Sequence, residues 1–228
     1  YYTLNGWLKG INNYNLGDPS DDPGKDALAG GPNDLFQKDL WGMNLGYFSG
    51  DYKINAGSPM YASIAAANPS ANELYNGNIA SWAKGQNFET SASFEESVSL
   101  SEYKYDRLNR IKRSWFKKLN VSSNVFEQTG NDGKAYFSEY SYDANGNIKK
   151  LERDNGDGDA FDKLTYSYTS NTNKLDRVTD AATFTMGTDL TTQLATNYTY
   201  DAIGNLTSDV SEGITNIEWT VYGKIKRI

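Results

Sequence analysis

The 228-residue sequence contains no cysteine and no histidine. Within this chain that excludes disulfides, thiolate nucleophiles, serine-histidine-aspartate triads and zinc sites built on nitrogen or sulfur ligands. Carboxylate, hydroxyl and lysine chemistry remain, but a sequence cannot show whether two carboxylates face each other at the separation that a glycosidase needs. We therefore expect no enzymatic activity, no cofactor and no metal ion in this chain.

Long apolar runs and clustered positive charge are also lacking. No stretch approaches the roughly 18 apolar residues that suggest a membrane-spanning helix. The net charge is −7, whereas binding a nucleic-acid backbone needs clustered lysine and arginine. The interrupted basic run over 104–118 favours a solvated strand face. We expect no membrane span and no nucleic-acid partner. Tyr1 begins within a motif and without an apolar leader, so we expect a fragment of a larger polypeptide.

Tyrosine is abundant, with 17 residues among 14% aromatics, although the hydrophobic share is only 38%. The mean hydropathy of −0.69 is low for a chain that must fill a thick core. A tyrosine buries a large ring and keeps a hydroxyl that needs a partner. This composition favours sheet faces that lie between protein and water.

A short pattern recurs four times at variable spacing. It consists of Tyr-x-Tyr, followed in its full form by Asp-x-x-Gly-Asn and an aliphatic residue. The two full copies contain Tyr140, Tyr142, Asp143, Gly146 and Asn147, and Tyr198, Tyr200, Asp201, Gly204 and Asn205. The two partial copies contain Tyr103, Tyr105, Asp106 and Asn109, and Tyr166, Tyr168, Thr169 and Thr172.

The pattern predicts a strand, a turn and a returning strand. Side chains alternate along a strand, so the two tyrosines share a face. The following aspartate can accept backbone N–H groups just ahead of it, and glycine supplies the positive φ of a tight turn. The partial copies lack that glycine, and the third also lacks the aspartate. We expect looser or longer turns there.

These units resemble the YD repeats of the Rhs family, which includes bacterial polymorphic toxins, Tc toxin shells and the animal teneurins. The tail from Trp219 to Gly223 is similar to the half-repeat of that family. The stretches 2–12, 39–52 and 75–79 resemble segments of Rhs proteins from Bacteroidetes. The Asp-Pro pair at 22–23 does not match the self-cleaving segment of such shells and favours a turn.

The resemblance implies antiparallel hairpins that spiral into part of a β-shell. It also implies a secreted or cell-surface protein whose shell encloses a carboxy-terminal domain of the same polypeptide. The expected partners are therefore the rest of that shell and its enclosed domain, with secretion machinery or cell-surface glycans as further candidates.

We predict an all-β chain with three parts. Residues 1–86 form an amino-terminal β segment with a long loop over 17–34 and room for a short helix near 63–67. Residues 87–101 are a polar insertion that could be strand or loop. Residues 102–228 hold the repeats, near 103–116, 140–153, 166–180 and 198–210, with the half-repeat over 217–228.

An acidic stretch offers a weak calcium hypothesis through Asp154, Asp157 and Asp159, because Ca²⁺ takes oxygen ligands. Aligning Gly158 with the glycine of a calcium loop puts Arg153 at the first ligand position and Leu164 at the twelfth. That register fails, and we favour a plain hairpin loop.

We expect a structural shell or scaffold segment of a larger secreted Rhs-type protein. The alternative is an adhesion or carbohydrate-binding module in which exposed tryptophans stack on sugars. The candidates for that role are Trp7, Trp41, Trp82, Trp115 and Trp219, which we expect to serve instead in packing. An open sheet leaves unpaired strand edges, so we also expect the chain to associate.

Overall fold

The computed structural model describes residues 1–16, 24–48, 51, 74–86, 98–120, 122–123, 125–184, 190 and 192–228. In these ranges the chain is nearly all β, with antiparallel strand pairs and one 3-10 turn at Asn131–Gly133. The all-β prediction is confirmed. Two compact units make up the chain: Tyr1–Phe137 with Gly156–Gly158, and Ser138–Asn155 with Asp159–Ile228.

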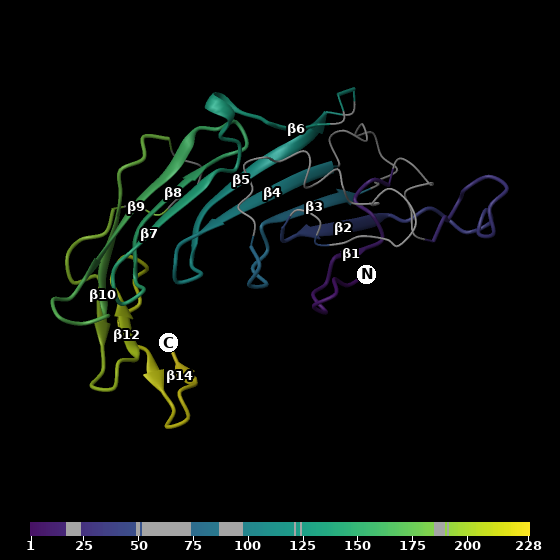
Figure 1. Ribbon diagram of the computed structural model, residues 1–228. Coiled ribbons are helices and arrows are strands. Elements are labelled where there is room, and N and C mark those ends of the chain that lie inside the picture. Colours follow the sequence, from purple (N-terminus) through teal and green to yellow (C-terminus); the bar gives the residue numbers. More distant parts are fainter. Residues whose placement is uncertain are drawn as a thin grey trace. The chain divides into compact units, whose positions relative to one another are not determined.

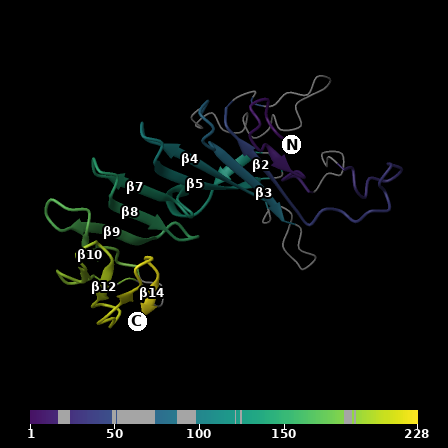
Figure 2. The ribbon, with the colours of Figure 1, turned by 90° about the horizontal axis from the view of Figure 1, so that it is seen from below.

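The first unit is built on a sheet of successive antiparallel neighbours, which lie side by side in both views (Figures 1 and 2). Each strand pairs with the next one along the chain. The strands are β1 (Gly10–Ile11), β2 (Trp41–Gly46), β3 (Ser81–Gln86), β4 (Val98–Tyr105), β5 (Ile111–Asn120) and β6 (Val125–Gln128).

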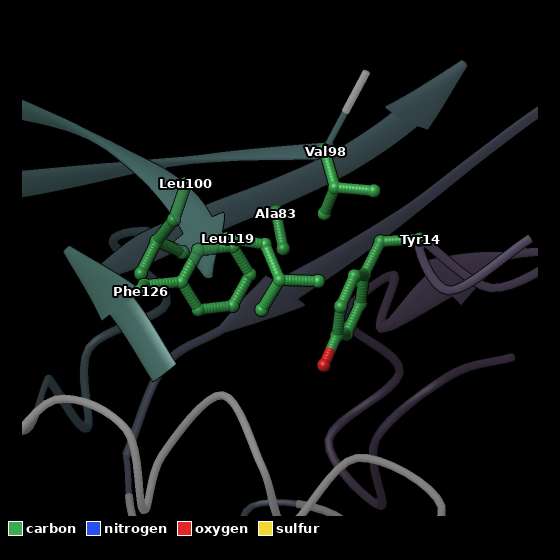
Figure 3. Packing of buried hydrophobic residues seen from close by; sticks show 6 residues of the cluster. All are labelled: Tyr14, Ala83, Val98, Leu100, Leu119 and Phe126. Carbon is green, nitrogen blue, oxygen red and sulfur yellow. The ribbon is translucent and has the colours of Figure 1, made fainter. Parts of the chain in front are cut away.

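One face of this sheet carries the core of the first unit. The register aligns Ala83 with Leu100 and Gly85 with Val98, so these alternating residues share a face. Figure 3 shows the six buried side chains of this cluster gathered together. They are Tyr14, Ala83, Val98, Leu100, Leu119 and Phe126. The rings of Tyr14 and Phe126 lie 5.7 Å apart between centroids.

A glycine pair lets the chain cross this face. Gly42 and Gly85 are opposite each other on β2 and β3. A Cβ on Gly42 would collide with the Asn13 carbonyl, and one on Gly85 with the Tyr14 carbonyl. The crossing segment is fixed by the Tyr14 N–H, which donates to the Asn44 side-chain oxygen at 2.8 Å. Tyr14 therefore reaches the core because two side chains are absent below its backbone.

The second unit consists of four sequential strands and two further hairpins. Strands β7 to β10 pair antiparallel, β11 pairs with β12, and β13 pairs with β14. Their bounds are β7 (Ser138–Tyr142), β8 (Ile148–Asp154), β9 (Ala160–Tyr168), β10 (Leu175–Asp180), β11 (Tyr198–Tyr200), β12 (Leu206–Asp209), β13 (Glu218–Trp219) and β14 (Ile225–Arg227).

The strand-turn-strand prediction is confirmed at all four repeats, and the residues 217–228 also contain a hairpin. Each contains a hairpin with a register shift beside its turn. Strand β4 begins at Val98, inside the insertion predicted over 87–101, while residues 87–97 lie outside the described residues. The helix expected near 63–67 also lies outside them. Residues 24–34 of the expected loop contain turns and one isolated bridge between Asp26 and Asn33.

Residues 3–7 near the amino terminus form a turn closed by a bridge between Tyr2 and Leu8. Within the described residues there is also no helix long and apolar enough to cross a membrane.

Adding a methyl group to either glycine of the crossing should destabilise the first unit. We expect Gly42→Ala and Gly85→Ala each to lower the free energy of unfolding by about 1–3 kcal/mol, since the new Cβ meets backbone that must move. Urea titration measures the change. Gly24→Ala is the control, because its Cβ meets only the movable Asp26 carboxylate, at 3.1 Å. Equal effects of Gly24→Ala and Gly85→Ala would contradict the prediction.

Candidate functional site

The turn that follows Asp143 defines the local geometry of the repeat. The Asp143 carboxylate accepts the backbone N–H groups of Asn145 and Asn147, both at 2.9 Å, and the Asn147 side-chain amide, also at 2.9 Å. The Asp143 N–H donates to the Asn147 carbonyl, and Gly146 has a φ of 95°. A short side chain and a left-handed residue thus close the turn, as the sequence predicts.

The turns at Asp201 and Asp106 follow the same plan. Asp201 accepts N–H groups from Ile203 and Asn205, and Gly204 has a φ of 97°. At Asp106 the left-handed residue is Asn109, with a φ of 61°, a conformation that asparagine tolerates. The Asp106 N–H donates to the Arg110 carbonyl across the same number of residues. The expectation of a longer or looser first turn was therefore wrong.

The third turn is longer, as expected. The Thr169 N–H donates to the Lys174 carbonyl, one residue further along than in the other turns. The Thr172 hydroxyl donates to the Thr169 carbonyl at 2.9 Å, and the left-handed residue is Asn171 with a φ of 59°.

Three further turns use the same plan, although the residues before them lack the Tyr-x-Tyr-Asp pattern. They start at Thr3, Asn155 and Thr220, whose N–H groups donate to the carbonyls of Trp7, Asp159 and Lys224. In each the first side chain accepts the N–H of the fifth residue, at 3.1, 2.9 and 3.2 Å. The fourth residue is a glycine of positive φ, namely Gly6, Gly158 and Gly223.

At five hairpins an aromatic residue at or just past the end of a strand links the hairpin to the preceding one. Its ring donates to the backbone carbonyl of the aliphatic residue that starts the earlier returning strand. We call this contact the ring–carbonyl bond. In the first unit it joins Tyr47 to Leu8 at 2.8 Å and Tyr105 to Ile79 at 2.9 Å.

The second unit contains three ring–carbonyl bonds. The Tyr168 hydroxyl donates to Ile148 at 2.8 Å, and the Tyr200 hydroxyl donates to Leu175 at 3.0 Å. In the half-repeat the donor is the indole N–H of Trp219, which reaches the Leu206 carbonyl at 2.7 Å. Tyrosine and tryptophan are thus equivalent here because each carries a donor at the far end of a ring.

The environment keeps these phenols in the donating form. Burial raises the pKa of Tyr105, Tyr168 and Tyr200 above the ordinary tyrosine value of 10.0. For Tyr168 the charge of Asp143 raises the pKa further. A protonated hydroxyl is the donor that the ring–carbonyl bond requires, so the bond persists throughout the neutral pH range.

The first aromatic residues of the motif are half-buried. Tyr140 stacks on Tyr142, with the ring centroids 6.4 Å apart and the planes at 11°. Burial raises the pKa of Tyr103 and of Tyr166. The Tyr198 hydroxyl accepts the Gln193 side-chain amide at 2.9 Å. The role of these tyrosines as framework residues stays a prediction.

Asparagines connect neighbouring turns in each unit. In the first unit the side-chain amides of Asn76 and Asn78 donate to Asn109, at 2.8 and 3.0 Å. In the second unit Asn145 and Asn147 donate to Asn173, at 3.0 and 2.8 Å. We call this arrangement the amide clasp.

The acceptors of the two clasps are Asn109 and Asn173. Each lies two residues before the aliphatic residue of the returning strand, which is the position of Gly146 in the full motif. The sequence analysis marked Asn109 as a departure from the motif but gave no signal of this role, and it did not single out Asn173.

A buried ion pair reinforces the first ring–carbonyl bond. The Lys9 ammonium lies 2.7 Å from the Asp51 carboxylate, with side chains only 4% and 6% exposed. Asp51 also accepts the Tyr47 N–H at 2.9 Å. Burial lowers the pKa of Lys9, although the hydrogen bond and charge of Asp51 act the other way. The pair joins residues 42 positions apart, which sequence reasoning missed.

The weak calcium candidates form an ordinary hairpin loop. Asp154 is buried at the end of β8, the Asp159 N–H donates to the Asn155 side chain, and the Asp157 carbonyl accepts the Asn131 N–H. The plain hairpin loop is confirmed by the pairing of β8 with β9. Across the described ranges, no group of three or more acidic side chains is close enough to hold a metal ion.

Two buried carboxylates, Glu102 and Asp162, are engaged in ion pairs. Burial raises the pKa of Glu102, but Lys117 lies 2.9 Å away and opposes that shift. Asp162 is 1% exposed and pairs with Arg153, its cross-strand neighbour. Both arrangements tie adjacent strands together.

The five tryptophans are all half-buried. Trp7 packs on Tyr47 at 5.1 Å between ring centroids, and Trp115 lies 5.9 Å from Phe137. Trp219 donates in a ring–carbonyl bond. Lys84 holds its ammonium 5.6 Å from the Trp82 ring. These contacts match the packing role predicted for the indoles.

Removing one ring hydroxyl should weaken the second unit. We expect Tyr200→Phe to lower the free energy of unfolding by about 0.5–1.5 kcal/mol, the net worth of one hydrogen bond. Urea titration measures the effect. Tyr222→Phe removes the same atom from a side chain that is 87% exposed, and it should change the stability little. If Tyr200→Phe and Tyr222→Phe lowered the free energy of unfolding equally, the ring–carbonyl bond would not be stabilising.

The turn carboxylate should make stability depend on acid. The Asn147 amide and the backbone N–H groups hold the pKa of Asp143 below its ordinary value of 3.8. A lowered pKa in the folded state adds stability above the unfolded-state pKa, and this contribution is lost as the pH falls through the folded-state pKa. Asp143→Asn should therefore differ most from wild type at pH 7.

Thermal unfolding from pH 7 down to pH 2 tests this dependence. The difference between wild type and Asp143→Asn should shrink below about pH 4. Ser141→Ala, a neutral change in the same hairpin, is the control and should keep a constant difference. If the stability difference between wild type and Asp143→Asn were equally large at pH 7 and pH 2, the charge of the Asp143 carboxylate would not be its cause.

Comparison with known proteins adds no identification. No protein-family model matches this chain, and no curated protein matches it. The geometry of the turns and their connecting bonds is therefore the basis for a functional proposal.

Proposed function

We propose that this chain is a structural segment of the wall of a larger secreted, Rhs-type protein, which encloses or presents a domain outside the chain. The observation that carries the proposal is the ring–carbonyl bond, which recurs five times within the two units. Its recurrence favours a scaffold because each copy fixes one hairpin onto the previous one.

The free energies of burial and hydrogen bonding support a stabilising role for the rings. Burying a large aromatic or aliphatic side chain contributes on the order of 1.5–3 kcal/mol, and one hydrogen bond contributes roughly 1 kcal/mol net. Both gains recur at each hairpin. A sheet of this kind can grow by adding hairpins without a thick central core, which fits the low hydrophobic content of the sequence.

The pairing of the charged groups also supports a structural role. Lys9, Glu102 and Asp162 are buried, and each has a partner of opposite charge among the described residues. A buried pair is costly to break because it leaves one uncompensated charge. Such pairs hold strands in fixed positions, as a structural segment requires.

Limited proteolysis of the intact secreted polypeptide tests the proposal. We expect this segment to survive as one resistant fragment and to co-elute with the enclosed domain in size-exclusion chromatography after cleavage. If the first proteolytic cleavage released all other domains from this segment, the segment would not enclose them. Binding of the chain to a glycan array, abolished by Trp82→Ala but not by Tyr222→Ala, would favour the carbohydrate-binding alternative instead.

A further inference from the structure

The turn between β4 and β5 differs in chemistry from the other turns of its kind. Its hairpin is internal to the sheet, since β4 also pairs with β3 and β5 also pairs with β6. The second and third residues of the turn are Arg107 and Leu108, whereas the turn at Asp143 has alanine and asparagine there. The Leu108 side chain is 66% exposed, and Arg107 is exposed as well. A hairpin with strands on both of its sides therefore presents an apolar and a cationic side chain to solvent.

Three cations lie on this hairpin without an acidic partner among the described residues. They are Lys104 near the end of β4, Arg107 in the turn and Lys112 near the start of β5, and all three are exposed. The carboxylate of the turn, Asp106, pairs instead with Arg110 at 2.6 Å. This local positive charge contrasts with the net charge of −7 for the whole chain. It favours an anionic partner at the turn.

A second exposed apolar side chain lies on the neighbouring turn. Tyr75 is 66% exposed, and its ring stacks on Phe48 with the centroids 4.6 Å apart. The start of β3 lies beside the end of β4, so the two turns are at the same edge of the sheet (Figure 1). The Asn76 amide, next to Tyr75, donates to Asn109, next to Leu108, at 2.8 Å. Two apolar side chains and three cations are thus presented together.

This combination fits one kind of partner better than others. A soluble polyanion needs only positive charge, and exposed apolar side chains add nothing to its binding. The surface of a membrane with anionic phospholipids offers phosphate groups to lysine and arginine and acyl chains to leucine. Tyrosine is typical of that boundary, because its ring is apolar while its hydroxyl stays in water.

We propose that the turn between β4 and β5 binds the surface of a membrane that contains anionic phospholipids. Leu108 enters the boundary between headgroups and acyl chains, Tyr75 lies at the level of the headgroups, and Lys104, Arg107 and Lys112 contact the phosphates. The attachment is weak and reversible, because few side chains enter the lipid. This inference goes beyond the proposed function, since a structural segment does not require contact with lipid. It holds whether or not the wall encloses a domain.

Flotation with lipid vesicles tests the charge contact. We expect the chain to float with vesicles of phosphatidylcholine and phosphatidylserine, but not with phosphatidylcholine alone, and to dissociate as salt is added. Lys112→Gln should weaken binding about 5-fold, as expected for one cation near an anionic surface. Lys149→Gln is the matched control, because Lys149 is exposed and follows Ile148 in β8 as Lys112 follows Ile111 in β5. It should leave vesicle binding unchanged.

A pair of serine substitutions tests the apolar contact. Leu108→Ser should weaken vesicle binding about 10-fold, because the leucine no longer leaves water. Ile203→Ser is the matched control and should have no effect. Ile203 is the third residue of the turn at Asp201, as Leu108 is of the turn at Asp106, and it is 85% exposed. Both side chains are exposed, so both variants should keep the thermal midpoint of the wild type.

The lack of cysteine in the chain allows a direct measurement of insertion. Leu108→Cys introduces a single thiol, so an environment-sensitive fluorophore can be attached at that position alone. Its emission should shift to shorter wavelengths when vesicles with phosphatidylserine are added. The same label on Ile203→Cys should not respond.

The inference is wrong if the wild type does not bind vesicles that contain phosphatidylserine, or if Leu108→Ser and Ile203→Ser bind them equally well. It is also wrong if the chain binds heparin as tightly as it binds the vesicles and Leu108→Ser changes neither affinity. In that case the turn would be a site for soluble polyanions.

Discussion

A hydrogen bond from an aromatic ring to a backbone carbonyl sets the relation between successive hairpins in each unit. It depends on two local features being present together. The turn must end so that an aliphatic residue starts the returning strand, and the next strand must end in a ring with a donor at its tip. Tyr168 and Trp219 meet the second condition with different chemistry. Geometry at the ring tip, and not residue identity, is therefore what the repeat preserves.

The turn itself tolerates more variation than the written motif suggests. Its first position accepts Asp143, Asn155 or Thr220, since each has an oxygen within reach of the N–H four residues ahead. Its fourth position accepts glycine or Asn109, because both enter the left-handed region at small cost. A pattern that requires aspartate and glycine together finds only part of the series.

Local chemistry explains what the sequence could predict. Strand alternation, the short acceptor side chain and the left-handed residue act within a few positions, so the hairpins at Asp143 and Asp201 follow from the residues alone. The Lys9–Asp51 pair and the crossing of Tyr14 above Gly42 and Gly85 join distant positions. Nothing in a local pattern specifies such partners, since they depend on the pairing order of the strands.

The variable spacing of the motif has a physical reason in the same bond. Donor and acceptor are 39 residues apart for Tyr47 and 13 for Trp219, yet the bonds measure 2.8 and 2.7 Å. The contact lies at the turn end of the hairpins, so the intervening chain can lengthen without moving it. The entropy of closing a longer loop rises only slowly with length. A repeat defined by a contact can therefore persist without a fixed period, which separates this architecture from a solenoid of uniform units.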